Sequence, residues 1–209
     1  MSKVIVSLGT GPQERLLRLA SRSFRRYARA HGYELSLHTR SVDPARPAPW
    51  SKVKLLRGLA AEHELVLWLD ADLVIVDGST DIASELEEKR FLYLVEHETK
   101  EGRIPNSGVM LLRGGAETIA FLDDVYAQDD LIDHRWWENA AISRLLGYEL
   151  DPARPGAPTT LLTEHTKFIS PRWNSIPDAP AREPRIRHYP GYSLKVRTAF
   201  MLRDELLRR

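Results

Sequence analysis

Two aspartates separated by one residue follow a short apolar run. The run Leu65–Leu69 reads Leu-Val-Leu-Trp-Leu, and Asp70 and Asp72 come directly after it. Such a run is typical of a strand buried on both faces of an α/β sheet, and such sheets bind ligands at the carboxyl ends of their strands. Carboxylate oxygens suit Mg²⁺ and Mn²⁺, which in turn hold phosphates. The pair therefore indicates a metal site, although a polar turn between two strands would have the same spacing.

A second group of polar residues lies near the end of the sequence, from Arg187 to Lys195. The imidazole of His188 is an acceptable third ligand for Mn²⁺, although a single histidine is more often a surface or structural residue. Gly191 would let the backbone approach a phosphate, and Lys195 would supply a positive point charge. Two adjacent acids repel each other unless water or a cation compensates, which favours the metal interpretation.

Composition excludes several classes of function. Thirty Lys and Arg against 29 Asp and Glu leave a formal charge of +1, so no global field attracts nucleic acid or anionic membrane. The absence of cysteine excludes disulfides, thiolate nucleophiles and cysteine metal clusters. No apolar stretch approaches the roughly 18 residues of a membrane span. We expect a single domain, residues 1–209, located in the cytoplasm.

The elements that would position these residues follow from the hydrophobic pattern, which predicts alternating strands and helices. Pro12 suits the first position of the first helix. The proline-rich part from Asp151 to Arg187 is expected to be irregular and to wrap over the sheet. The strands are expected at 4–6, 34–38, 65–69, 73–76, 91–95 and 109–112, and the helices at 12–30, 52–61, 116–126, 138–146 and 196–207.

Short motifs occur in a fixed order over most of the chain. They are Trp50-Ser51-Lys52 with Leu55, Leu56 and Arg57; Trp68-Leu69-Asp70-Ala71-Asp72; Asn106-Ser107-Gly108-Val109 with Arg113; Trp137-Glu138-Asn139-Ala140-Ala141; and His188 to Lys195. In this order they resemble the motifs of nucleotide-sugar-dependent glycosyltransferases of GT-A fold. The chain is most similar to the retaining family that includes yeast Golgi mannosyltransferase subunits and plant xyloglucan xylosyltransferases. The closing segment and the pair Trp173-Asn174 resemble those of glycogenin-like transferases.

The resemblance implies an α/β fold of GT-A type, with a mostly parallel central sheet flanked by helices. It also implies a role for each matching residue. Asp70, Asp72 and His188 would hold Mn²⁺ or Mg²⁺ against the donor diphosphate, while Glu138 and Asn139 would lie beside the anomeric carbon. The implied donor contacts are Ser7, Gly9, Thr10 and Gly11 for base and ribose; Asn106 and Ser107 for the sugar; Gly191 and Lys195 for the β-phosphate; and Ala71, Lys52 and Arg57, of which the last two are otherwise solvated helix residues.

The reaction implied is transfer of a hexose or pentose from a UDP-linked or GDP-linked sugar to a hydroxyl acceptor, with retention. A front-face substitution is preferred to a covalent intermediate on Glu138, because no second carboxylate is evident. Members from eukaryotes carry an N-terminal membrane anchor that this sequence lacks, so no Golgi role is expected. The acceptor and the oligomeric state, including a homo-oligomer, stay open.

Two other classes of protein fit parts of the pattern. A nucleotidyltransferase would continue Gly9-Thr10-Gly11 into Gly-x-Gly-x-x-x-Arg-Met, and this chain does not. An inactive sugar-nucleotide or glycan-binding module would not need both acids together with His188 and Glu138.

Two further groups of residues allow more than one interpretation. Trp136 and Trp137 could form a platform for a sugar or pack in the core. Glu96, His97 and Glu98 alternate faces on a strand, so we expect acceptor-side surface there rather than an ion site.

Overall fold

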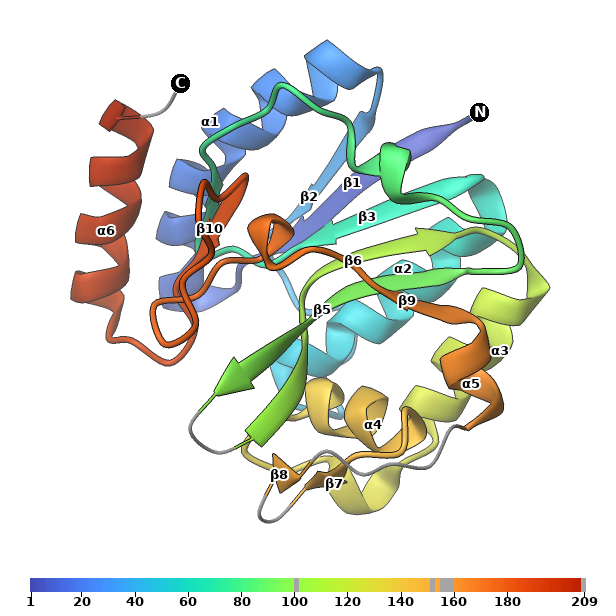
Figure 1. Cartoon of the computed structure of the whole chain (residues 1–209). Coiled ribbons are helices and arrows are strands. Elements are labelled where there is room, and N and C mark those ends of the chain that lie inside the picture. Colours follow the sequence, from blue (N-terminus) through green and yellow to red (C-terminus); the bar gives the residue numbers. More distant parts are fainter. Residues whose placement is uncertain (100–101, 151–152, 155–159, 208–209) are drawn as a thin grey trace.

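The computed structural model describes the chain except residues 100–101, 151–152, 155–159 and 208–209 (Figure 1). Six strands form the central sheet in the order β2-β1-β3-β6-β5-β9. They are β1 (Lys3–Leu8), β2 (Glu34–His38), β3 (Leu65–Leu69), β5 (Leu92–Thr99), β6 (Gly102–Arg113) and β9 (Thr166–Phe168). Only β6 is antiparallel to its neighbours in this sheet. The expected mostly parallel sheet is therefore confirmed.

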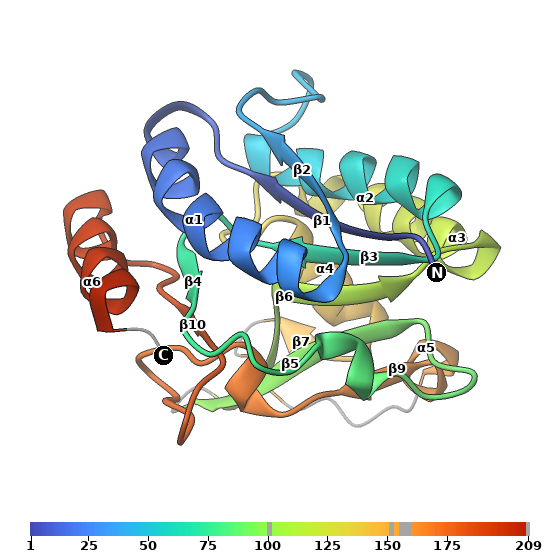
Figure 2. The same cartoon turned by 90° about the horizontal axis from the view of Figure 1, so that it is seen from above.

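Helices cover both faces of the sheet (Figures 1 and 2). One face packs against α1 (Glu14–His31), with α6 (Leu194–Leu207) beyond it. The other face packs against α2 (Ser51–Glu62), α3 (Ala116–Tyr126) and α4 (Glu138–Leu145). Alternate residues of β3 enter the two cores, which is why all five are apolar and buried. No helix of the described residues is long and apolar enough to cross a membrane.

A small second sheet lies beside the end of β3. Its strands are β4 (Leu73–Ile75) and β10 (Ile186–His188), which pair antiparallel with His188 opposite Leu73. The chain turns from β3 into β4 through Asp70 and Asp72, so this pairing places His188 next to the two aspartates. The remaining elements, β7 (Glu149–Leu150), β8 (Ala153–Arg154) and α5 (Leu161–Glu164), lie before β9 in the chain.

An irregularity in the hairpin of β5 and β6 falls at the same end of β3. The partner of Leu94 is Met110, but the partner of Val95 is Asn106, so residues 107–109 lack partners on β5. β-Bulges of this kind redirect side chains and often lie beside active sites. Here the irregularity lies in the expected motif Asn106-Ser107-Gly108.

Three expectations about elements need correction. Pro12 lies in a 3₁₀ turn (Gly11–Gln13) and α1 begins at Glu14, because Gly11 takes a left-handed φ of 53° before the proline. The strands β5 and β6 extend well beyond 91–95 and 109–112. The part expected to be irregular contains α5, β9 and most of β10, although residues 151–152 and 155–159 of it lie outside the described residues. Three-residue strands are too short to produce a hydrophobic period.

Candidate active site

Asp70 follows β3 and has one oxygen held by the protein. Its Oδ1 accepts a hydrogen bond from Trp68 Nε1 at 2.6 Å and lies 3.2 Å from Lys52 Nζ. Its Oδ2 lies 3.7 Å from Nε2 of His188. The carboxylate is thus anchored through one oxygen and presents the other to the imidazole.

The two carboxylate oxygens of Asp72 likewise have different partners, Arg197 and His188. Its Oδ2 accepts from Arg197 Nη1 at 2.9 Å, and its Oδ1 lies 3.3 Å from His188 Nε2. Burial alone would raise the pKa of Asp72, but His188 and Arg197 outweigh it and lower the pKa to about 2. Asp72 is therefore ionised at neutral pH.

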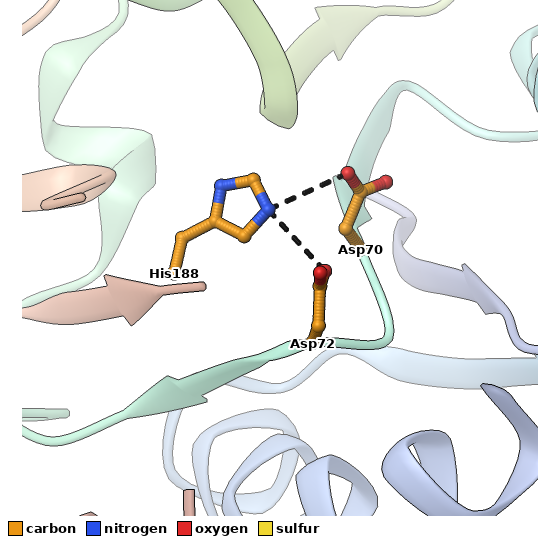
Figure 3. A group of neighbouring side chains, drawn as sticks. All are labelled: Asp70, Asp72 and His188. Atoms are coloured by element: carbon orange, nitrogen blue, oxygen red, sulfur yellow. Dashed lines mark ion pairs between the residues drawn. The ribbon is translucent and has the colours of Figure 1, made fainter. Parts of the chain in front are cut away.

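A chain of hydrogen bonds fixes the orientation of His188. The backbone N–H of Gly108 donates to Asn106 Oδ1 at 2.9 Å, and Asn174 Nδ2 donates to the same oxygen at 2.9 Å. The amide oxygen of Asn174 must then be the atom 3.0 Å from His188 Nδ1, so Nδ1 carries a proton. The other ring nitrogen, Nε2, points at the two aspartates (Figure 3).

Gly108 allows this imidazole to lie against β6. A Cβ at this position would come within 2.3 Å of His188 Cε1 and 2.9 Å of Asn106 Oδ1, distances that real Cβ atoms do not adopt. The motif therefore requires a glycine at position 108, because the imidazole of His188 lies too close to the backbone there for any side chain.

The three side chains fit a divalent cation. Ligand atoms of Asp70, Asp72 and His188 lie within 4.8 Å of one another, and no other group of the described residues is arranged in this way. A cation placed between these groups would bind the Nε2 lone pair of His188 and an oxygen of each carboxylate at once. One nitrogen and two carboxylate oxygens form a ligand set that suits Mn²⁺ and is acceptable to Mg²⁺.

Lys52 links Asp70 to Glu138 at the start of α4. The lysine is only 4% exposed, and its Nζ lies 2.7 Å from Glu138 Oε1 and 3.2 Å from both the backbone oxygen and Oγ of Ser107. Burial alone would lower the pKa of Lys52, but Asp70 and Glu138 raise it. Burial raises the pKa of Glu138 against the opposing effect of Lys52. Among the described residues of this centre, the three carboxylates of Asp70, Asp72 and Glu138 face two side chains that are always cationic, Lys52 and Arg197, so one carboxylate is left for His188 or a bound cation to balance.

Glu138 follows a strained residue. Trp137 has a φ of 45° and a ψ of −125°, which a non-glycine residue rarely adopts, and 41% of its surface is exposed. Such strain is commonly stored at functional sites.

Asn139, the residue after Glu138, bonds to β6. Its side-chain amide accepts from the N–H of Ser107 at 2.8 Å and donates to the backbone oxygen of Pro105 at 3.1 Å. Its amide therefore fixes α4 to β6.

These residues line one large cleft, with a volume of about 1280 Å³. The expected site residues that line it are Thr10, Lys52, Asp70, Ala71, Asp72, Asn106, Ser107, Glu138, Asn139, His188 and Gly191.

No protein-family model and no curated protein matches the sequence. Solved structures do match. A glycosyltransferase involved in glycosylation of the major capsid of PBCV-1 superposes with a TM-score of 0.70 at 16% identity, covering 96% of this chain and 99% of that one. The galactosyltransferase LgtC, in complex with donor and acceptor sugar analogues, gives 0.58 at 11% identity, with 95% of both chains covered. The glycosyltransferase GlyE of Streptococcus pneumoniae gives 0.57 at 16% identity and covers 96% of this chain but 61% of that one.

The fold is that of the GT-A glycosyltransferases. Identities this low show the fold alone. In this GT-A fold the cleft lies where β3 ends and where β6, α4, β10 and α6 converge.

Five expected donor contacts do not line the cleft of this GT-A fold. Ser7 and Gly9 are buried, and Gly11 is exposed at the start of its 3₁₀ turn. Arg57 lies on the outer surface of α2, where it pairs with Asp123 at 2.6 Å and 3.0 Å. Lys195 is exposed at the start of α6.

Sequence reasoning missed two residues of the site. Arg197 lies two positions after Lys195 and reaches Asp72, which Lys195 does not. The signal was the run of basic residues after Gly191, but only the helix geometry of α6 selects among them. Asn174 belonged to a recognised pair with Trp173, yet its bonds to Asn106 and His188 join distant segments.

Proposed function

We propose that this chain is a metal-dependent, retaining glycosyltransferase, a single GT-A domain of residues 1–209. It would transfer a sugar from a nucleoside diphosphate sugar, with UDP favoured over GDP, to a hydroxyl acceptor. The observation that carries the proposal is the convergence of Asp70, Asp72 and His188 in the cleft. The matching structures support it, since each is named a glycosyltransferase and LgtC holds donor and acceptor sugar analogues.

Asp70, Asp72 and His188 would hold Mn²⁺ or Mg²⁺. When bound, such an ion supplies Lewis-acid neutralisation of the leaving diphosphate.

Arg197 is the residue best placed to add charge to the diphosphate from the protein. It lines the cleft, and its Nε is buried without a hydrogen-bond partner among the described residues. A planar guanidinium can bind two phosphate oxygens in a fixed bidentate geometry, whereas the ammonium of a lysine acts as a point charge. Arg197 would thus take the role that the sequence had given to Lys195.

Glu138 is better suited to stabilise positive charge than to attack the sugar. Its Oε1 is paired with Lys52 at 2.7 Å and accepts from Ser107 Oγ at 3.3 Å, and both contacts lower the nucleophilicity of the carboxylate. In a front-face reaction the bond from the anomeric carbon to the phosphate oxygen breaks. The bond to the acceptor oxygen forms on the same face, and the acceptor proton passes to the departing phosphate oxygen.

Asn106, Ser107 and Asn139 would position the donor. Asn139 and Ser107 are joined through the backbone N–H of Ser107, so that the bulged part of β6 presents a fixed surface to the sugar. This preorganisation limits the rearrangement needed when the donor binds.

Calorimetric titration with UDP, GDP and their sugar conjugates, in Mn²⁺ and again in EDTA, tests the proposal. We expect one nucleotide to bind in Mn²⁺ only, and Asp72→Asn to weaken this binding by at least about tenfold. Even residues that only orient metal ligands cost about 10–100-fold in metal affinity when they are changed. Asp123→Asn, on the outer surface, is the matched control and should bind as the wild type does. If no nucleotide binds, or if EDTA and Asp72→Asn have no effect, the transferase proposal is wrong. Metal-dependent hydrolysis of the bound donor separates an enzyme from an inactive binding module.

A further inference from the structure

His97 is a buried residue of β5 whose hydrogen-bonding groups are unused. The residue is only 2% exposed, and neither Nδ1 nor Nε2 of its ring has a hydrogen-bond partner among the described residues. Nearly all buried polar side chains are hydrogen-bonded, because an unpartnered one costs free energy. His97 is therefore costly to the empty protein and calls for a functional reason.

His97 is shared by two hollows of the molecule. It lines the large cleft, and it also lines a second cavity with a volume of about 450 Å³. The second cavity is formed by residues 96–98 of β5, 170–172 and 179–182. A ligand that extended from the cleft into this cavity would pass the imidazole.

The cleft has room for a second substrate. Its volume of about 1280 Å³ exceeds the roughly 300–1,000 Å³ of pockets that hold one small ligand. The ion-binding residues Asp70, Asp72 and His188 occupy one part of its wall, and His97 belongs to another element, β5.

The chemistry of the second cavity suits a neutral ligand rich in hydroxyl groups. Its charged residues are two carboxylates, Glu96 and Glu98, and two guanidiniums, Arg172 and Arg182, so their charges cancel. Glu96 also pairs with Arg103 and Arg172 with Glu183, which adds one charge of each sign nearby. An anionic ligand would therefore gain no net attraction, and an apolar ligand would remove charged groups from water. Hydroxyl groups can donate to the carboxylates and accept from the guanidiniums.

We propose that the acceptor is a neutral saccharide that reaches from the cleft past His97 into the second cavity, where His97 hydrogen-bonds its hydroxyl groups. This inference rests on the proposed transferase function and adds the class of the acceptor.

The state of His97 suits this role. Burial, with a smaller effect from His188, lowers the pKa of His97 to about 4, so the ring is neutral at pH 7. A neutral imidazole has one N–H donor and one acceptor nitrogen. It can therefore donate a hydrogen bond to one hydroxyl group of a saccharide and accept a hydrogen bond from another.

Saturation-transfer NMR tests the proposal on protein saturated with UDP and with Mg²⁺, which is diamagnetic. The probes are lactose, maltose, cellobiose and methyl β-xyloside, with glucose 6-phosphate and anisole as the anionic and apolar comparisons. We expect signals from at least one neutral saccharide and stronger ones than from either comparison. His97→Leu should weaken saccharide binding at least tenfold, while His97→Gln, which keeps a donor and an acceptor, should retain part of it.

The stability of His97→Leu gives a readout that needs no saccharide. Replacing unpartnered nitrogens by methyl groups should raise the melting temperature by about 2–4 °C, whereas loss of a structural histidine would lower it. His63→Leu is the matched control, since Nδ1 of His63 is also buried and unpartnered among the described residues but lies outside both hollows. It should bind saccharide as the wild type does.

The outcomes separate the two proposals. If the wild type does not bind UDP, the transferase function itself fails. If it binds UDP but no neutral saccharide, or if His97→Leu binds saccharide as well as the wild type or melts at a lower temperature, the inference about His97 and the acceptor is wrong.

Discussion

At the scale of single residues, the carboxylates of the cleft are held in place before any ligand arrives. Lys52 and Trp68 hold one oxygen of Asp70, and Arg197 holds one oxygen of Asp72. The oxygens that face His188 are the ones these partners leave available. An ion would therefore find ligands that need little reorganisation.

Asn174→Leu tests whether the amide orients the imidazole of His188. Removing it takes away the acceptor of the Nδ1 proton, so we expect Mn²⁺ affinity to fall by about 10–100-fold in a calorimetric titration. ¹⁵N NMR of His188, recorded at a pH high enough for the ring to be neutral, should show the Nδ1–H form in the wild type and a mixture of tautomers in the variant.

Gln128→Leu is the control for this prediction, because it removes an amide that bonds to Ala141 outside the cleft. Its Mn²⁺ affinity should equal that of the wild type. If the Mn²⁺ affinity and the tautomer of His188 are both unchanged in Asn174→Leu, the amide of Asn174 does not position the imidazole.

Gly108→Ala should displace His188, because the new methyl group would overlap the imidazole. We expect a loss of stability of about 1–3 kcal/mol in urea unfolding and at least a tenfold loss of Mn²⁺ affinity. Gly58→Ala is the control: its Cβ would meet nothing within 4 Å, and it lies in α2, so it should gain about 0.5–1 kcal/mol. Equal Mn²⁺ affinity for Gly108→Ala and the wild type would contradict the close approach of His188 to the backbone of Gly108.

At the scale of elements, the site depends on pieces that are short or irregular. The bulge of β6 presents Ser107 and Gly108, β10 supplies His188, and α6 supplies Arg197. The last element is fixed by Asp204, a buried residue that accepts from Arg187 Nη1 at 2.7 Å and from the hydroxyl of Tyr189. Asp204 thus joins α6 to β10 and the residues just after it.

Asp204→Ala should loosen α6 while the central sheet stays folded. Losing charge-assisted hydrogen bonds in a buried place should cost about 1–3 kcal/mol, and amide exchange should quicken in α6 and β10 but not in β1 or β3. We also expect weaker Mn²⁺-dependent UDP binding, because Arg197 and His188 lose their support. Asp130→Asn, a change in an exposed pair with Arg144, should leave exchange and binding as they are. Uniform exchange changes across the sheet would count against local loosening.

The sequence predicted the elements that repeat a pattern over many residues. The long helices and the buried strand β3 were found, and the motif residues Asp70, Asp72 and His188 do meet. The strands β9 and β10 were not found, because their stability comes from partners far away in the chain rather than from their own residues. Arg197 and Asn174 were missed for the same reason. Arg57 lies outside the cleft, and helix spacing alone does not show which way a polar face points.

At the scale of the whole molecule, two cores lie on either side of one sheet, and polar contacts join the surrounding segments to it. Asp81 is such a contact: its carboxylate accepts from Lys3 Nζ at 2.9 Å, Tyr33 Oη at 2.7 Å and the N–H of Ala83 at 3.0 Å. Burial would raise the pKa of Asp81, but the bonds from Ala83, Lys3 and Tyr33 outweigh it and lower the pKa below 3.8. The ionised form therefore stabilises the fold.

Asp81→Asn should reduce the free energy of unfolding at pH 7 by about 1–3 kcal/mol. Because the folded pKa is lower than the unfolded one, the contribution of the carboxylate is complete above the unfolded value of 3.8 and is lost as the pH falls through the folded value. The difference between wild type and variant in urea unfolding should hence be constant from pH 7 to 5 and narrow below pH 3.8. A difference that widened in acid would contradict this linkage.

The placement of β10 and α6 also has a consequence for biosynthesis. The ribosome delivers β1, β2, β3, β5 and β6 before β10 and α6. His188 and Arg197 are therefore synthesised after all five of these strands. A nascent chain carries Asp70 and Asp72 before the third ligand residue and the arginine of the cleft have been made.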